Sequence, residues 1–236
     1  MSKIGYGYGS EWHLLRFLGY HRDYLNQEIE DVIGMGTIKW LDFPFSGLNE
    51  RFKRDEEYKG LNFLDDNQYE HILSKWKEYW PTTGNQQNWD AIGKAGSDDT
   101  WILVEAKANL EECESSTQAK PATENGGRDK IIEAFKDPIK LLTGSTDTDP
   151  EIWLNKYYQY ANRLAVLHFL NENKIKANLL FIYFIGDDNT SGTCPKSKDA
   201  WETKVQDIHE HLRIDEKSPL MKQVKHLYLP IIKNYS

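Results

Sequence analysis

The sequence predicts an α/β protein in which a mixed β-sheet is flanked by helices, with extra helices toward the N-terminal end. Two apolar runs, at residues 101–104 and 178–185, are continuous enough to be strands buried on both faces of a sheet. Residues 151–173 are apolar over much of a helical circumference, which predicts a long buried helix between them. This order of elements is typical of a sheet with helices packed on it.

The N-terminal part of the chain predicts two helices and a short strand. Ser10 is a plausible N-cap for a helix over about residues 10–30, weakened at Gly19. Residues 38–43 predict a short strand, our candidate for the first strand of the sheet. A second helix is expected over residues 66–79, because its apolar spacing is helical and ends before a proline.

The rest of the chain predicts a hairpin, a polar segment and a helix-strand-helix-strand ending. Strands are expected at residues 88–92 and 100–108, because the residues between them are rich in Gly, Ser and Asp. A polar stretch follows, in which only residues 130–142 look helical. The final predicted elements are a helix over residues 198–212 and a strand over residues 224–230.

Length and composition predict one soluble cytoplasmic domain. The 236 residues show no clear linker, no run long enough to span a membrane and no apolar core of a signal peptide near Met1. Cys113 and Cys194 lack metal-ligand spacing and are expected to be free thiols. We divide the single domain, residues 1–236, into N-terminal helices with the first strand (10–80), two central strands (85–108), a polar insertion (109–150) and the closing elements (151–233).

The charged end of the central predicted strand is the most informative local feature. Glu105 and Lys107 are two residues apart, so they project from one face of the strand. Charged groups at the end of a buried strand cost several kcal/mol each unless they are paired or bound to a metal. Asp90 lies in the preceding predicted strand, and a hairpin can bring it beside Glu105. Since two adjacent carboxylates repel each other, the pattern predicts a divalent cation, with a salt-bridged strand end as the alternative.

These residues resemble the signature of the PD-(D/E)xK nuclease superfamily, an acid on one strand followed by acid-x-lysine on the next. Here Asp90 is followed, after fourteen residues, by Glu105, Ala106 and Lys107. The chain also resembles an uncharacterised bacterial family within that superfamily, over most of its length and including residues 157–170. The resemblance implies a restriction-endonuclease-like fold. One departure is Trp89, which stands where the superfamily name has proline.

The resemblance also implies roles for individual residues. Asp90 and Glu105 would bind Mg²⁺ or Mn²⁺, and Lys107 would orient the attacking water or stabilise charge on the phosphate. Glu11 resembles an additional metal-binding acid on the first helix, and Gln159 resembles a glutamine that contacts the catalytic centre. The alternatives are structural: a salt bridge for Lys107, a favourable helix dipole for Glu11 and a buried hydrogen bond for Gln159.

Three arginines are candidates for binding a substrate. Arg16 lies on the locally basic first helix with His13, Arg128 follows two glycines that could cradle a phosphate, and Arg163 lies one helical turn after Gln159. For the first two, the alternative is an ordinary solvated surface. For Arg163, the alternative is a partner inside a buried helix.

The sequence therefore predicts an enzyme that uses Mg²⁺ or Mn²⁺ to hydrolyse phosphodiester bonds in DNA or RNA. A net charge of −8 weakens the expectation of strong nucleic-acid binding, because such affinity comes mainly from lysine and arginine. Two alternatives stay open: a non-catalytic module that binds nucleic acid or protein, and a metal-dependent hydrolase of small phosphorylated metabolites. The pattern does not determine the oligomeric state.

Overall fold

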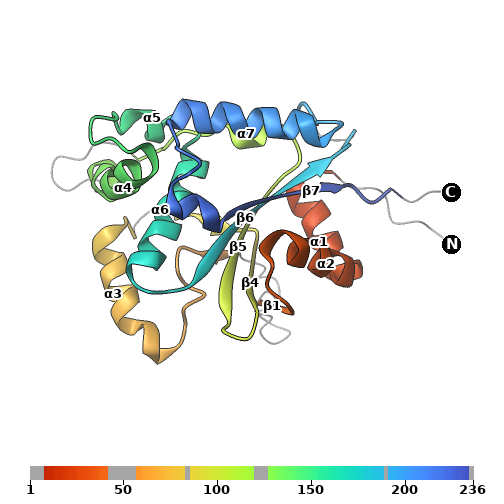
Figure 1. Ribbon diagram of the computed structural model, residues 1–236, viewed down its shortest axis with the longest axis horizontal. Helices are drawn as coiled ribbons and strands as arrows, with labels where there is room; N and C mark the ends of the chain where they lie inside the picture. Colours follow the sequence, from red (N-terminus) through yellow and green to blue (C-terminus); the bar gives the residue numbers. More distant parts are fainter. Residues whose placement is uncertain (1–7, 42–56, 83–85, 120–126, 189–190, 234–236) are drawn as a thin grey trace, which may run out of the picture.

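The computed structural model describes residues 8–41, 57–82, 86–119, 127–188 and 191–233, and it forms a five-stranded mixed sheet between two layers of helices (Figure 1). The strand order is β1-β4-β5-β6-β7. The β1–β4 and β4–β5 pairs are antiparallel, whereas the β5–β6 and β6–β7 pairs are parallel. The strands are β1 (Ile38–Leu41), β4 (Ala91–Ala95), β5 (Thr100–Lys107), β6 (Ala177–Ile185) and β7 (Val224–Pro230).

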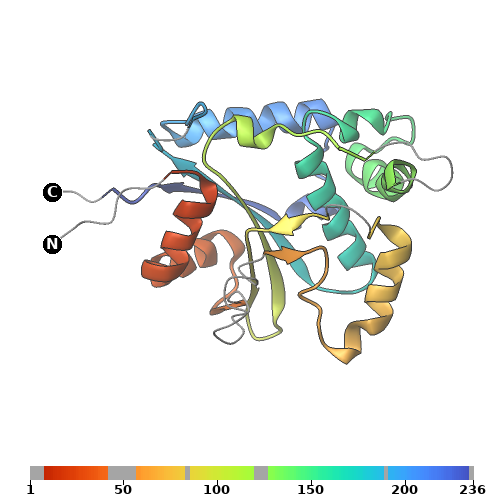
Figure 2. The same ribbon diagram turned by 180° about the vertical axis from the view of Figure 1, so that it is seen from behind.

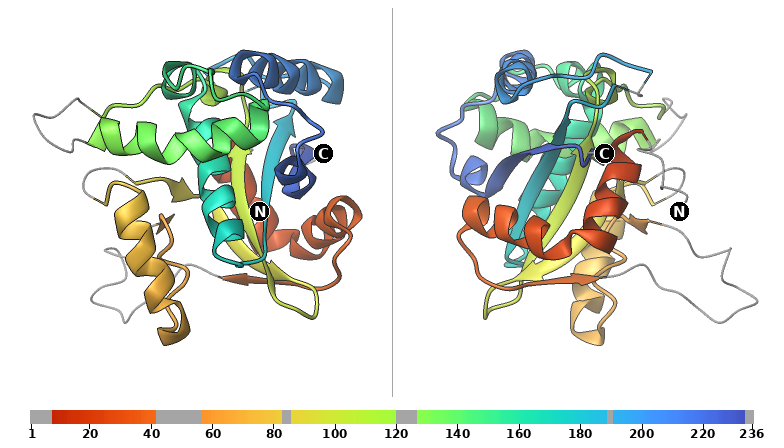
Figure 3. Two further views of the ribbon diagram at one scale, coloured as in Figure 1. Left: turned by 60° about the vertical axis from the view of Figure 1, so that its left-hand side comes forward. Right: turned by 90° about the vertical axis from the view of Figure 1, so that its right-hand side faces the viewer.

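The helices divide between the two faces of this sheet (Figure 3). The first two, α1 and α2, pack on one face, and the later helices pack on the other. The α-helices are α1 (Ser10–Tyr20), α2 (Arg22–Ile33), α3 (Glu70–Tyr79), α4 (Gly127–Thr143), α5 (Glu151–Leu154), α6 (Tyr158–Glu172) and α7 (Lys198–Leu212). Short 3-10 helices are η1 (Asn67–Tyr69), η2 (Glu111–Cys113) and η3 (Pro219–Gln223).

The predicted buried strands and the predicted mixed α/β class are confirmed. All of β5 is buried, and its side chains alternate between two cores. Leu103 faces the core beneath α6, whereas Ile102 and Val104 face the core beneath α1 and α2. In α6, eleven consecutive residues from Tyr160 to Leu170 are buried, which confirms a helix enclosed on all sides.

The expected single helix over residues 10–30 is wrong, because the chain breaks at His21. This residue has φ −132° and ψ 33°, outside the helical range, and α2 begins immediately afterwards. The break lets Phe17 on α1 and Leu25 on α2 pack into the same core, where Phe17 stacks on Phe184 of β6. The break lies two residues after Gly19, where the sequence predicted weakness.

The expected helix over residues 151–173 is also divided, into α5 and α6. The chain between them pairs with a distant segment: Ser115 donates its N–H to the carbonyl of Lys156, and Tyr158 donates to the carbonyl of Ser115. Lys156 takes a left-handed conformation at φ 56°, which a continuing helix excludes. The consequence for the site is that α6 begins at Tyr158, beside the end of β5.

The expected strand over residues 88–92 is divided at Asp90. Its first part, β3 (Asn88–Trp89), pairs with β2 (Tyr58–Lys59) in a separate two-stranded sheet (Figure 2), which the sequence did not predict. Its second part is the beginning of β4, which extends to Ala95 and forms the expected hairpin with β5. Asp90 itself is a bend between the two sheets.

Most other predicted elements are confirmed, with altered ends. The early strand is present as β1, although residues 42 and 43 of that prediction lie outside the described residues. The helix in the polar segment begins at Gly127 instead of residue 130, and α7 and β7 have the predicted bounds. Both cysteines are free. Across the described residues, none of the helices has the length and apolar character needed to cross a membrane.

Candidate active site

Asp90 lies at the bend where the chain leaves the small sheet and enters β4. Its N–H donates to the carbonyl of Val104 at 3.2 Å, and its Oδ2 accepts a 2.6 Å hydrogen bond from the N–H of Ala106. Ala91 pairs with Val104 in the antiparallel β4–β5 ladder, so the same register continued by one residue places Asp90 opposite Glu105. The hairpin thus makes the two acids neighbours, as the sequence predicted.

Glu105 and Lys107 lie on the face of β5 that packs against α6. Both are buried, with exposed fractions of 1% and 9%. The Lys107 ammonium donates to Glu105 Oε1 at 2.5 Å and to Gln159 Oε1 at 2.8 Å. Gln159 is in the first turn of α6, where the break after α5 positions it. The structure therefore brings together Asp90, Glu105, Lys107 and Gln159.

Arg163, on α6, forms an ion pair with the other carboxylate oxygen of Glu105. Its Nε and Nη2 lie 2.8 and 2.7 Å from Glu105 Oε2. Its guanidinium also donates to the carbonyl of Asn88 and to Asn162 Oδ1, and it lies 4.7 Å from the centre of the Trp89 ring. With this many partners, Arg163 links α6 to both sheets.

These groups line one cleft of about 470 Å³. Its lining is acidic, with the carboxylates of Glu57, Asp90, Glu105 and Glu112. The cations among the described lining residues are Lys107 and Arg163, and both are paired with Glu105. The cleft therefore offers carboxylate oxygens on one side and little free positive charge.

Burial and mutual repulsion shift the ionisation of these acids. Burial raises the pKa of Asp90 to about 8, and the charge of Glu105 adds to this effect. Burial also raises the pKa of Glu57, with smaller contributions from Glu11 and Glu105. Burial opposes the ionisation of Glu105, but Arg163 and then Lys107 outweigh it and lower its pKa. Burial therefore favours the protonated, uncharged form of Asp90 at neutral pH, and it shifts Glu57 in the same direction.

The donor atoms of this cleft fit a hard divalent cation. Mg²⁺ prefers oxygen ligands and is commonly held by one or two carboxylates, with waters and substrate phosphates completing its shell. Asp90 and Glu105 line the same cleft and could supply such a pair, and a bound cation would offset the burial and the Glu105 charge that raise the pKa of Asp90. Across the described parts of the chain, no three His, Cys, Asp or Glu side chains are placed to enclose a metal alone. The site is open rather than a closed protein cage.

Comparisons with known proteins add no family to this geometry. No family model, curated protein or solved structure matches the chain. The resemblance to the PD-(D/E)xK superfamily therefore stays a prediction, carried by Asp90, Glu105 and Lys107.

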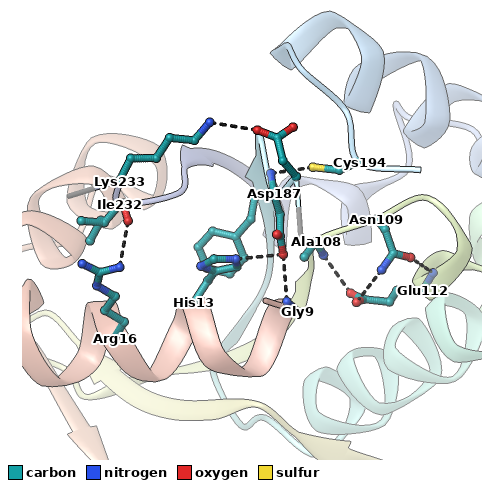
Figure 4. Close-up of polar contacts among 12 residues, drawn as sticks. Gly9, His13, Arg16, Ala108, Asn109, Glu112, Asp187, Cys194, Ile232 and Lys233 are labelled. Atoms are coloured by element: carbon teal, nitrogen blue, oxygen red, sulfur yellow. Dashed lines mark hydrogen bonds and ion pairs between the residues drawn. The ribbon is translucent and has the colours of Figure 1, made fainter. Parts of the chain in front are cut away.

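The remaining predicted site residues lie outside the cleft. Glu11 lines a neighbouring hollow of about 830 Å³, which shares Ser10 and Glu112 with the cleft. Arg16 donates to the carbonyl of Ile232 at 2.8 Å (Figure 4). Arg128 pairs with a carboxylate of α5 at the surface. The cleft is lined by neither Arg16 nor Arg128.

Figure 4 shows the polar contacts that fix the segment after β5 and the helix α1. Glu112 accepts hydrogen bonds of 2.8 Å from the N–H of Ala108 and from Asn109 Nδ2. His13 is 1% exposed, and its Nε2 lies 2.9 Å from Asp187 Oδ2. His13 therefore anchors α1 to the end of β6, and it does not contribute to a solvated basic face.

Several cleft residues were not predicted from the sequence, among them Glu57 and Gln87. Glu57 precedes β2 and lines the cleft through the fold of the small sheet. It belongs to a run of acids that looks like an ordinary charged loop. Gln87 directly precedes β3, and the polar run of Gln86, Gln87 and Asn88 before the buried Trp89 was the signal that could have revealed it.

Proposed function

We propose that this protein is a metal-dependent hydrolase of phosphodiester bonds, similar to a nuclease, with a restriction-endonuclease-like fold. One observation carries the proposal. Asp90, at a bend beside the central strand, shares a cleft with Glu105 and Lys107 at the end of that strand. This is the arrangement of acids and lysine that the PD-(D/E)xK signature requires. DNA or RNA is the proposed substrate.

Asp90 and Glu105 would hold Mg²⁺ or Mn²⁺ in this proposal. When bound, such an ion would supply Lewis acidity to a phosphate and acidify a coordinated water. The open cleft supports this role, because it leaves room for water and substrate beside the two acids.

Lys107 is the residue suited to act on the reacting phosphate. Two of its three N–H donors are directed to Glu105 and Gln159, which leaves a third for an attacking water or a phosphate oxygen. Gln159 is a positioning residue, because it holds the ammonium from the first turn of α6. A positive charge fixed in advance at this point lowers the energy of the negatively charged transition state.

The test is hydrolysis of linear, circular and single-stranded DNA and of RNA in Mg²⁺ or Mn²⁺. We expect activity in the wild type and a loss of about 100-fold or more in Asp90→Asn and in Lys107→Met. Asp98→Asn is the matched control, because Asp98 lies at the opposite end of the same hairpin and pairs with Lys176 at the surface. Activity that survives in both cleft variants would rule out this mechanism.

A second candidate is a non-catalytic module that binds nucleic acid or protein. The observation that favours it is the state of Glu105, whose two oxygens are already occupied by Lys107 and Arg163. In that case the charges serve as a buried network and no metal is needed. The two candidates differ in metal binding, because only the hydrolase requires stabilisation by Mn²⁺ that is lost in Asp90→Asn.

A further inference from the structure

Gln87 has an unusual environment for a buried amide. The residue is 6% exposed, and neither Oε1 nor Nε2 has a hydrogen-bond partner in the described part of the structure. Its backbone is well fixed, because its carbonyl accepts a 2.8 Å hydrogen bond from the N–H of Gly60. The unsatisfied groups therefore belong to the side chain alone.

An unpartnered buried amide is costly, and such groups are rare in folded proteins unless they serve a purpose. Gln87 lines the same cleft as Asp90 and Lys107. Its neighbour Gln86 shows the usual solution, since its amide donates to the carbonyl of Thr82 at 3.1 Å. A ligand in the cleft is thus the natural partner for the Gln87 amide.

The side chains near Gln87 favour a flat ligand. Trp80 and Tyr158 also line the cleft. Trp80 is 3% exposed and packs on Trp76 and Phe135, so it supports the wall of the cleft. The half-buried Tyr158 is the aromatic ring that a ligand could contact. Aromatic side chains of this kind bind unpaired bases by stacking, with little dependence on base identity.

We propose that Gln87 reads the edge of a nucleobase beside the scissile phosphate. This inference rests on the proposed function, because it assumes that a phosphodiester occupies the acidic end of the cleft. The side-chain amide of Gln87 has a hydrogen-bond acceptor next to a donor. The Watson–Crick edge of each base also has a donor next to an acceptor, so the two can pair. The substrate is therefore an unpaired nucleotide, whose base satisfies Gln87 while its phosphate lies near Asp90 and Lys107.

Binding of the four nucleoside 5′-monophosphates, compared with ribose 5-phosphate, tests this assignment by calorimetry on the full chain. We expect at least one nucleotide to bind about tenfold more tightly than the sugar phosphate, because a base would satisfy the buried amide. Gln87→Met should remove most of that preference. Gln27→Met is the matched control, because Gln27 is exposed on α2 and its amide donates to Asp31 Oδ1 at the surface.

Thermal unfolding without ligand gives a second, independent measurement. Methionine has a similar shape but no amide, so Gln87→Met should raise the melting temperature of the free protein. A lower melting temperature would show that the amide is satisfied within the protein, and it would overturn the proposal. An equal preference for the base in wild type and variant would overturn it as well.

The two proposals fail in different ways. If the protein binds nucleotides through Gln87 but cleaves no phosphodiester in any metal, the hydrolase is wrong and the base subsite is retained as part of a binding module. If it cleaves nucleic acid while Gln87→Met leaves base preference unchanged, the subsite is wrong and the hydrolase is retained. A wild type that does not distinguish nucleotides from ribose 5-phosphate also rejects the subsite.

Discussion

Glu105 is held by two cations whose roles differ. Lys107 binds one oxygen and faces the cleft, whereas Arg163 binds the other oxygen beneath it. The side chains of Arg163 and Glu105 are 3% and 2% exposed. A buried ion pair adds little net stability, but removing one partner leaves an uncompensated charge that is strongly destabilising. At the scale of single residues, Arg163 is therefore structural and Lys107 is available for chemistry.

Arg163→Met should lower the free energy of unfolding by about 3 to 5 kcal/mol, because Glu105 keeps only one cation and the contact with Trp89 is lost. Urea denaturation measures this loss. Arg128→Met is the matched control, since its surface pair with Glu151 should contribute about 1 kcal/mol or less. Equal effects of the two substitutions would contradict a structural role for Arg163.

At the scale of elements, the sequence predicted the strands and helices whose hydrophobic pattern lies within one continuous segment. The buried strands β5 and β6 and the helix α7 follow from apolar runs and helical spacing. The breaks at Lys156 and Asp90 could not be predicted, because they coincide with backbone contacts to distant segments. The pairing of Ser115 with the chain before α6 is one such contact. A periodic pattern contains no information about which distant backbone will pair with it.

The same distinction applies to the site. Asp90, Glu105 and Lys107 could be predicted to meet, because a hairpin and the two-residue repeat of a strand fix their relation. The polar run before Trp89 makes Gln87 a candidate, but the place of Glu57 and Gln87 in the cleft depends on the small sheet formed by β2 and β3. Whether the Gln87 amide has hydrogen-bond partners depends on residues that are distant in the sequence.

Within β7, His226 predicts how stability depends on pH. Its ring stacks on Phe181 and Tyr183, with planes 12° from parallel to each. Burial, with a smaller effect of the His209 charge, lowers the pKa of His226 to about 3. The unfolded chain has the ordinary value of about 6.5. Because the folded pKa is the lower one, His226 contributes full stability above pH 6.5 and loses it as the pH falls toward 3.

For a single histidine with these values, the loss between pH 8 and pH 5 is about 2 kcal/mol. His226→Phe should remove that part of the acid sensitivity while keeping the aromatic stack. Urea unfolding of wild type and variant at both pH values measures the difference. His71→Phe is the control, because His71 is exposed on α3. An unchanged dependence on pH in His226→Phe would show that another group is responsible.

At the scale of the whole molecule, the net charge of −8 and the pairing of several cations within the fold limit how nucleic acid could bind under the proposed function. Lys107 and Arg163 pair with Glu105, Arg128 pairs with Glu151, and Arg16 bonds to a backbone carbonyl. Few of these charges are free to neutralise phosphates along a duplex. Under the proposed function, this favours recognition of one or a few nucleotides within the cleft over contact with a long stretch of backbone.

The charge of the molecule also determines how metal binding must be tested. Any salt can screen repulsion in an acidic protein, so the melting temperature should be compared in Mn²⁺ and in NaCl of equal ionic strength. At a Mn²⁺ concentration 100 times its Kd, binding to the native state alone adds about 2.7 kcal/mol, which corresponds to a rise of about 5 to 10 °C for a chain of this size. EDTA should reverse the rise. Asp90→Asn should lose it, whereas Asp98→Asn should retain it, because Asp98 is a surface acid outside the cleft. The same rise in both variants would assign the effect to the surface and leave the cleft without a metal.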